Sequence, residues 1–117
     1  MGGHEDCIFC KIASGAFGTG FVGENAHAVA FRDIQPQAPT HVLVVPRRHV
    51  SALREMTVAD AEELAATLML AAEVAEREGL HDGGYRVITN DGPDAGQTVF
   101  HLHFHVLGGR KLTEPLG

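Results

Sequence analysis

Basic residues are scarce in this sequence of 117 residues: nine lysines and arginines stand against fifteen aspartates and glutamates, and the formal net charge is −6 at pH 7. A protein that binds nucleic acid needs a basic surface to displace the counterions of the phosphate backbone. The composition therefore argues against a nucleic-acid partner. It leaves a nucleotide site open, because a single phosphate needs only a few hydrogen-bond donors.

Long apolar runs are also missing. No stretch approaches the roughly 20 residues of a membrane span, and the opening MGGHEDCIFC lacks the charged-then-apolar order of a signal peptide. We therefore expect a cytoplasmic protein with no membrane partner. Cysteine occurs only at Cys7 and Cys10, and in a reducing compartment this pair is not expected to form a structural disulfide.

The length and composition fit one globular domain. Apolar residues make up 44% and charged residues 21% of the chain, which is close to the average of soluble proteins, and a chain of this size buries a core without disulfides. No repeat, low-complexity tract or linker divides it. We expect a single domain over 1–117, with a flexible N-terminus at 1–6 and a C-terminal tail at 110–117.

Apolar periodicity and turn residues predict two or three strand pairs and one long helix between them. The helix begins after the N-cap Thr57, with Asp60 three positions on as a capping box, and Gly79 ends it. These elements make an α+β domain whose mostly antiparallel sheet carries the helix on one face. The other expected elements are a short helix over 7–14, a hairpin over 22–32 that turns at Glu24-Asn25, and strands over 41–46, 85–89 and 99–107.

Within the long helix, one set of apolar residues recurs at helical spacing. These residues are Ala61, Leu64, Ala65, Leu68, Ala72 and Ala75. We expect this stripe to face the sheet, because an amphipathic helix buries its apolar side. The glutamates of the helix lie off the stripe and are expected to face water.

The most informative segment is His101-Leu-His-Phe-His-Val-Leu107. Because strand side chains alternate between faces, Leu102, Phe104 and Val106 are expected to face the core and the histidines the opposite side. A merely solvated face would more often hold threonine, lysine or glutamate. Two functional interpretations remain. The histidines hold a zinc ion that activates water, or a neutral imidazole attacks phosphorus and forms a phosphoramidate that water cleaves.

The residues before this segment favour the nucleophile. Gly96-Gln97-Thr98 ends a glycine-bearing loop, and glycine lets backbone N–H groups approach an anion closely. Gln97 and Thr98 add side-chain donors. A glycine loop and a histidine strand, the two halves of a phosphate site, are therefore adjacent in the sequence.

The cysteines form a separate motif, Cys7-Ile-Phe-Cys10, which provides half of a zinc site. Histidines are the available partners, since the chain has no other cysteine. A redox pair would be expected to open a helix after a strand, and no such setting is predicted here. Inert buried thiols are the remaining alternative.

His-x-His-x-His followed by two apolar residues is the motif of the histidine triad (HIT) superfamily, and the string GQTVFHLHFHVLGG resembles its Hint branch. Further similar segments lie over 31–49 and 85–90, so the resemblance covers about 7–109. It implies a HIT-like fold: a mostly antiparallel sheet of about five strands with one long and one short helix. It also implies a homodimer in which two sheets join and the long helices pack together.

The activity that this resemblance implies is hydrolysis of the P–N bond of purine nucleoside 5′-phosphoramidates, such as AMP–amine or AMP–lysine conjugates. The nucleophile attacks the α-phosphorus, an amine leaves, and water cleaves the nucleotidyl-histidine, with no metal required for catalysis. The expected partner is a purine nucleotide: AMP, GMP or an AMP conjugate. The alternatives are a dinucleoside polyphosphate hydrolase of the same superfamily, a non-catalytic nucleotide-binding or interaction protein, and a three-histidine metallohydrolase.

Catalytic roles follow from the same resemblance. His103 is the implied nucleophile, and His101 and His105 support it. His41 is expected to orient the nucleophile through a hydrogen bond, because an imidazole needs a defined tautomer. Thr98 is expected to assist the leaving group.

The resemblance also assigns the contacts of the nucleotide. The implied phosphate contacts are Gly96, Gln97, Thr98, His103 and His105. Asn90 is expected near the ribose and phosphate, and Asp33 is the ribose acceptor. The apolar walls around the purine are Ile8, Phe9, Ile12, Phe31 and Ile34. For Phe9 and Ile12, plain core packing accounts for the residue equally well.

Two further expectations concern a metal and the tail. The implied ligands of a structural zinc ion are Cys7, Cys10, His49 and His101. Such a site would tie the N-terminal turn to the histidine strand. The tail departs from close Hint relatives, because Glu114 stands where they carry a tryptophan that helps to shape the partner subunit's site. The leaving-group side is therefore where this sequence differs most.

Overall fold

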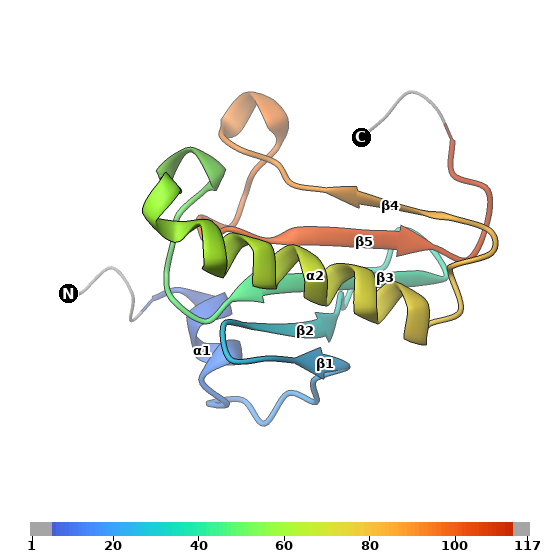
Figure 1. The fold of residues 1–117 in the computed structure, drawn as a ribbon, viewed down its shortest axis with the longest axis horizontal. Coiled ribbons are helices and arrows are strands. Elements are labelled where there is room, and N and C mark those ends of the chain that lie inside the picture. Colours follow the sequence, from blue (N-terminus) through green and yellow to red (C-terminus); the bar gives the residue numbers. More distant parts are fainter. Residues whose placement is uncertain (1–5, 114–117) are drawn as a thin grey trace.

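The structure is a computed structural model that describes residues 6–113. Glu114, the end of the predicted tail and nearly all of the predicted N-terminal segment lie outside the described residues. The helices and strands (Figure 1) are α1 (Ile8–Ala13), β1 (Gly23–Glu24), β2 (Ala28–Arg32), β3 (Thr40–Pro46), α2 (Ala61–Arg77), β4 (Tyr85–Ile88) and β5 (Phe104–Gly108). Short 3₁₀ turns lie at Leu53–Glu55, Val58–Asp60 and Pro93–Ala95.

The strands form one five-stranded antiparallel sheet in the order β1-β2-β3-β5-β4. This confirms the predicted α+β fold. The ladder places His105 of β5 between Leu43 of β3 and Ile88 of β4, and places His41 opposite Leu107. Because opposing residues share a face, His41 and His105 are diagonal neighbours at the centre of the sheet.

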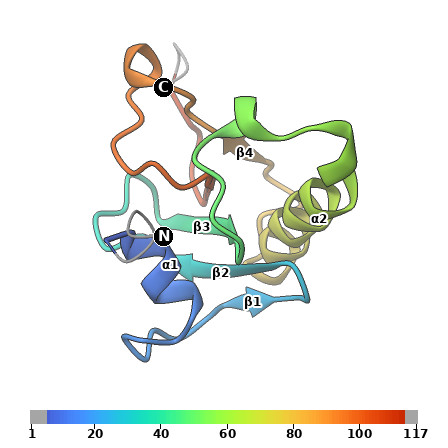
Figure 2. The same cartoon turned by 90° about the vertical axis from the view of Figure 1, so that its left-hand side faces the viewer.

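Both faces of the sheet are covered, by different helices. On β3, Val42 and Val44 belong to the cluster beneath α2, whereas Leu43 and Val45 pack in the cluster of α1. Figure 2 shows α1 and α2 on opposite sides of the strands. His41 alternates with Val42 and therefore faces the α1 side. The long helix α2 therefore does not cover the face of the sheet that carries His41 and His105.

The long helix turns a different face to the sheet than the apolar stripe predicted. Its buried residues are Thr67, Leu70, Ala71, Val74 and Ala75. Of the predicted stripe, only Ala75 is among them, and Leu68 is 40% exposed. Alanine has the highest helix propensity and is tolerated on a solvated face. Its recurrence therefore did not mark the buried side, which the larger Leu70 and Val74 define.

The start of this helix is also shifted. The backbone N–H of Thr57 donates to the carboxylate of Asp60 at 2.9 Å, so the predicted capping pair forms. It caps a 3₁₀ turn, however, and α2 begins only at Ala61. In the part of the chain that the structure describes, no helix is long and apolar enough to cross a bilayer.

The last strand is shorter than the predicted 99–107, because its ladder covers only Phe104–Gly108. The ladder ends at the pair of Val44 and Phe104. Two positions further, Pro46 of β3 has no N–H to donate, and its carbonyl is held by the His101 ring at 2.8 Å. Residues 101–103 lie outside the sheet. The predicted alternation survives, since Leu102 is buried against Val50.

Candidate active site

His103 has one ring nitrogen bound and the other available. Its Nδ1 lies 2.7 Å from the carbonyl oxygen of His101. A carbonyl can only accept, so Nδ1 carries the hydrogen and Nε2 keeps a lone pair. Burial lowers the pKa of His103, which keeps the ring neutral at pH 7. A neutral imidazole with a fixed tautomer is a competent nucleophile.

The ring and backbone of His103 are both supported. Phe9 packs edge-on against the ring, with centroids 5.0 Å apart and planes at 82°. The hydroxyl of Thr89 donates to the His103 carbonyl at 2.8 Å. Only 7% of the residue is exposed, so the position of Nε2 is fixed by packing before any substrate arrives.

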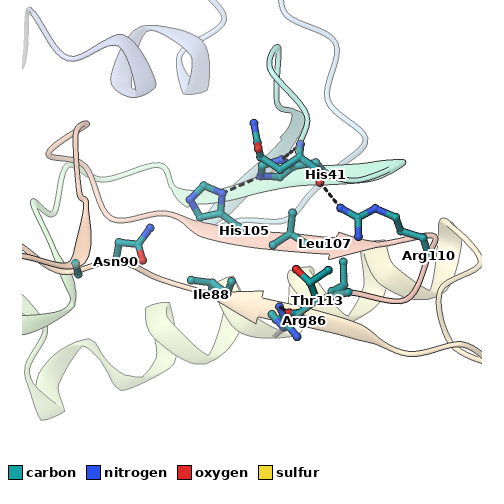
Figure 3. Close-up of a pocket in the computed structure, with 11 residues that line it drawn as sticks. His41, Arg86, Ile88, Asn90, His105, Leu107, Arg110 and Thr113 are labelled. Atoms are coloured by element: carbon teal, nitrogen blue, oxygen red, sulfur yellow. Dashed lines mark hydrogen bonds between the residues drawn. The ribbon is translucent and has the colours of Figure 1, made fainter. Parts of the chain in front are cut away.

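His105 is oriented by His41. The Gln37 backbone N–H donates to Nδ1 of His41 at 2.9 Å, and Nε2 of His41 lies 2.8 Å from Nδ1 of His105. Because Nδ1 of His41 accepts, its Nε2–H donates to His105 (Figure 3). His105 therefore presents an Nε2–H donor. The prediction that His41 orients the nucleophile is wrong: a backbone carbonyl performs that task for His103, and His41 sets the tautomer of the neighbouring histidine.

The local electrostatics keep this pair neutral. Burial, with His103 and His41 nearby, lowers the pKa of His105 to about 4. Burial also lowers the pKa of His41, although the carboxylate of Asp33 opposes this shift. That carboxylate lies 3.4 Å from Nε2 of His41. In this structure Asp33 faces the histidines, and its contact with a ribose stays a prediction.

A cavity of about 380 Å³ opens beside His105 and His41. Asn90 lines it from the loop after β4 (Figure 3), and its contact with ribose and phosphate stays a prediction. Thr98 lines a different cavity of about 420 Å³, together with Ile8 and His49. The structure therefore brings Asn90, but not Thr98, into the cavity of His105, and the assistance of Thr98 to a leaving group stays a prediction.

The predicted role of Gln97 as a phosphate donor is contradicted. Its side chain is buried, its Nε2 donates to the carbonyls of Ser51 and Val99 at 2.8 and 3.1 Å, and its oxygen accepts from the Gly92 N–H at 2.8 Å. Both amide hydrogens are therefore taken. Gln97 instead holds the loop in place through these hydrogen bonds. Gly96 in this loop takes the left-handed conformation (φ 87°), and the contact of Gly96 with phosphate stays a prediction.

The expected purine walls are only partly assembled. Phe9 and Phe31 are 7% and 3% exposed and pack edge-to-face in the core, with Ile12 against their cluster. Core packing therefore accounts for these aromatic rings. Ile34 is 94% and Ile8 48% exposed, and these two residues line no common cavity in the described part of the chain.

The cysteine motif meets two histidines, as predicted. One ligand atom from each of Cys7, Cys10, His49 and His101 lies within 4.8 Å of the other three. The Sγ atoms of Cys7 and Cys10 are 3.3 and 3.4 Å from Nδ1 of His101, and Cys10 Sγ is 3.3 Å from Nδ1 of His49. A tetrahedral zinc ion separates sulfur and nitrogen ligands by about 3.5 Å, given bond lengths of about 2.3 and 2.0 Å. The four residues fit zinc.

The protonation pattern of this cluster supports the fit. His101 donates its Nε2–H to the carbonyl of Pro46 at 2.8 Å, which leaves the Nδ1 lone pair directed at the cysteines. Burial, together with Cys7, raises the pKa of the Cys10 thiol to about 11; a bound cation would favour the thiolate instead. The His101 ring therefore lies in the cysteine cluster. His101 contacts His103 through its backbone carbonyl rather than through its ring, and its support of catalysis stays a prediction.

Comparison with known proteins matches residues 17–112 to the family model of the HIT domain. The chain belongs to the HIT family. It is 39% identical to the purine nucleoside phosphoramidase of Escherichia coli over 108 residues, which cover 92% of this chain and 91% of that one. It is 44% identical to an uncharacterised HIT-like protein of Synechococcus elongatus over 113 residues, 97% and 98% of the two chains. The crystal structure of a HIT family hydrolase from Legionella pneumophila superposes with a TM-score of 0.92 at 45% identity, covering 96% of this chain and all of that one.

Several supports of this HIT site could not be found from the sequence. Thr89 holds the backbone of His103 through its hydroxyl, and the Gln37 N–H and Pro46 carbonyl fix the tautomers of His41 and His101. Backbone groups carry no side-chain signal, so only the tertiary structure shows them. From the sequence, Thr89 is predicted only to end the strand over 85–89.

Proposed function

We propose that this HIT protein hydrolyses the P–N bond of purine nucleoside 5′-phosphoramidates through a covalent nucleotidyl-histidine on His103. The observation that carries the proposal is the tautomer of His103: Nδ1–H is bound to the His101 carbonyl, so the Nε2 lone pair is free to attack. The name of the E. coli relative, purine nucleoside phosphoramidase, supports the same substrate class.

The reaction proceeds by two substitutions at the α-phosphorus. His103 Nε2 forms a bond to phosphorus, the P–N bond breaks, and the nitrogen leaves as an amine after protonation. Water then breaks the bond between phosphorus and His103 and releases the nucleoside monophosphate. The His105 Nε2–H, held by His41, donates to a phosphate oxygen on which negative charge grows.

The test compares wild type with His103→Ala on a fluorogenic AMP–amine substrate, with intact-mass detection of an AMP adduct. The matched control is His27→Ala, because His27 pairs with Glu62 outside the histidine cluster. We expect turnover and an adduct in wild type and the control, and neither in His103→Ala. Faster turnover of diadenosine polyphosphate than of the amide would favour the polyphosphate hydrolase. AMP binding without turnover of either would favour a binding module.

We propose in addition that Cys7, Cys10, His49 and His101 hold a structural zinc ion. A zinc ion with four protein ligands has no position open to substrate, so its contribution is to fix α1 against residues 49 and 101. The donor distances and the His101 tautomer described above support this proposal. Zinc content and unfolding measurements test it without reference to turnover.

A homodimer is the third element of the proposal. The outer side of α2 exposes Leu68 and Met69 at 40% and 67%, next to the exposed Ala65 and Ala72. This row leaves an apolar helix face for a second copy. Light scattering would show a dimer for wild type and a monomer for Met69→Glu, whereas a monomeric wild type would overturn the dimer.

A further inference from the structure

Most arginines in this acidic chain pair with carboxylates. Of the seven arginines in the sequence, five have a carboxylate oxygen at 2.7–2.9 Å: Arg32, Arg47, Arg48, Arg54 and Arg77. The other two are Arg86 and Arg110. Neither has a carboxylate partner among residues 6–113, and both donate to backbone carbonyls instead. Arg86 donates to Thr113 at 3.2 Å, and Arg110 to Gln37 at 2.9 Å and Lys111 at 3.1 Å.

Both unpaired arginines line the cavity that contains His105 (Figure 3). Arg86 lies opposite Leu107 on β5, two residues from the pair formed by Ile88 and His105. Such diagonal neighbours in a sheet are about 7–8 Å apart, which an arginine side chain can span. Both arginines therefore line the same cavity as His105, on the far side of Leu107 from its ring (Figure 3).

Among residues 6–113, the lining of this cavity contains two arginines and no carboxylate. The two histidines that line it, His41 and His105, are neutral at pH 7 for the reasons given above. A carbonyl satisfies a hydrogen bond but does not neutralise a charge. A guanidinium has five N–H donors, of which Arg86 uses one within residues 6–113.

We propose that Arg86 and Arg110 bind an anionic group, a carboxylate or a second phosphate, on the leaving-group side of the substrate. This inference rests on the proposed function. The reacting phosphate is engaged by His103 and His105, so the arginines serve a different part of the molecule. Guanidinium groups bind carboxylate and phosphate oxygens in a bidentate manner. The preferred amides are therefore those of amino acids with a free carboxylate rather than those of neutral amines.

The test measures binding in the His103→Ala background, where the ligands are not hydrolysed. AMP–glycine, with a free carboxylate, is compared with AMP–glycinamide, which has the same shape and no charge there. ADP is compared with AMP to measure the same advantage for a second phosphate. We expect the anionic ligand to bind about tenfold more tightly, the usual size of a charge-assisted hydrogen bond.

The arginines are tested by Arg86→Gln and Arg110→Gln, in which the amide can still donate to the backbone carbonyl. The control is Arg47→Gln, whose arginine pairs with Glu24 outside the cavity. The advantage of the anionic ligand should disappear in Arg86→Gln, weaken in Arg110→Gln and persist in the control. Equal affinities in the parent protein, or an advantage that persists in both cavity variants, would overturn the inference.

Failure of the proposed function would be seen separately. Turnover of AMP–glycinamide by the wild-type protein tests the hydrolase without the arginines. Hydrolysis of that neutral amide with no preference for AMP–glycine would retain the function and reject the anionic subsite. Tighter binding of AMP–glycine without hydrolysis of either amide would retain the anionic subsite and reject the proposed function. Circular dichroism melting of each variant verifies that it is folded.

Discussion

His101 and His103 lie only two residues apart, yet their rings have different surroundings. A backbone carbonyl holds Nε2 of His101, so its Nδ1 is directed at Cys7 and Cys10. A backbone carbonyl holds Nδ1 of His103, so its Nε2 is available to a substrate. The role of each histidine therefore follows from the acceptor on its other nitrogen rather than from its place in the motif.

The two regions around these histidines differ in the groups that they bring together. In the cysteine cluster, one ligand atom from each of four residues lies within 4.8 Å of the other three, and Cys7 and His49 line the cavity of about 420 Å³. The region of His105 and His41 opens into a cavity of about 380 Å³. The regions are joined by the His101 residue, whose ring belongs to the first and whose carbonyl orients the nucleophile of the second. In the proposed function, the first region holds the segment in place through zinc and the second carries out the reaction.

The largest effect is expected from breaking the cysteine region. Replacing Cys7 and Cys10 together by serine should reduce bound zinc from one ion per chain to none. It should lower the free energy of unfolding by about 4 kcal/mol or more, as is typical when a structural metal is lost. Atomic emission and denaturant unfolding measure the two quantities. A wild-type protein purified without zinc, and as stable as the serine variant, would contradict the prediction.

Removing the hydrogen bond between His41 and His105 should leave the bound zinc unchanged. His41→Ala removes the donor to His105 Nδ1 and should lower kcat by about 10–100-fold with little change in KM, because the tautomer of a catalytic group is lost. Zinc content should equal that of wild type. His41→Gln, whose amide can donate, should recover part of the activity. Nitrogen-15 NMR of His105 should show a changed tautomer in His41→Ala. An unchanged tautomer would show that His41 does not set the tautomer of His105.

The pH dependence of stability should reveal the low pKa of His105 in the proposed catalytic region. The pKa of His105 is about 4 in the folded protein, below the ordinary value of about 6.5 expected for the unfolded chain. As the pH falls below 6.5 the unfolded chain gains a proton that the folded one does not, so stability is lost. Between pH 7 and 5, wild type should lose on the order of 1 kcal/mol more than His105→Gln in denaturant unfolding. An equal loss in both proteins would contradict the low pKa.

The smallest effect is expected at the support of His103. Thr89→Val removes the hydroxyl that donates to the His103 carbonyl and should lower stability by about 1 kcal/mol. The matched control is Thr67→Val, because the Thr67 hydroxyl also donates to a backbone carbonyl, that of Glu63 within α2. Both variants should lose similar stability in thermal melts. Only Thr89→Val should also lower kcat, by a few-fold, and an unchanged kcat would assign Thr89 a purely structural role.

Sequence patterns predicted much of the architecture correctly because they depend on local chemistry. The hairpin of β1 and β2, the strands β3 and β4 and the capping pair of Thr57 and Asp60 all form where turn residues, β-branched residues and polar caps indicated. The face of α2 was predicted wrongly, because alanine is compatible with both water and core. The buried face of α2 is the one on which Leu70 and Val74 pack against the sheet.

By itself, the sequence determined the alternation of histidines with apolar residues in segment 101–107 and the spacing of Cys7 and Cys10, and so which kinds of ligand and nucleophile are present. Only the tertiary structure decided how they are used. It brought Pro46, Gln37 and Thr89 to the histidines and buried both amide hydrogens of Gln97. It also placed Arg86 and Arg110 at the cavity, where each donates to a backbone carbonyl and neither has a carboxylate partner among residues 6–113. The physical reason is that tautomers and charge compensation depend on contacts between distant parts of the chain, often through backbone groups that are chemically alike at every residue.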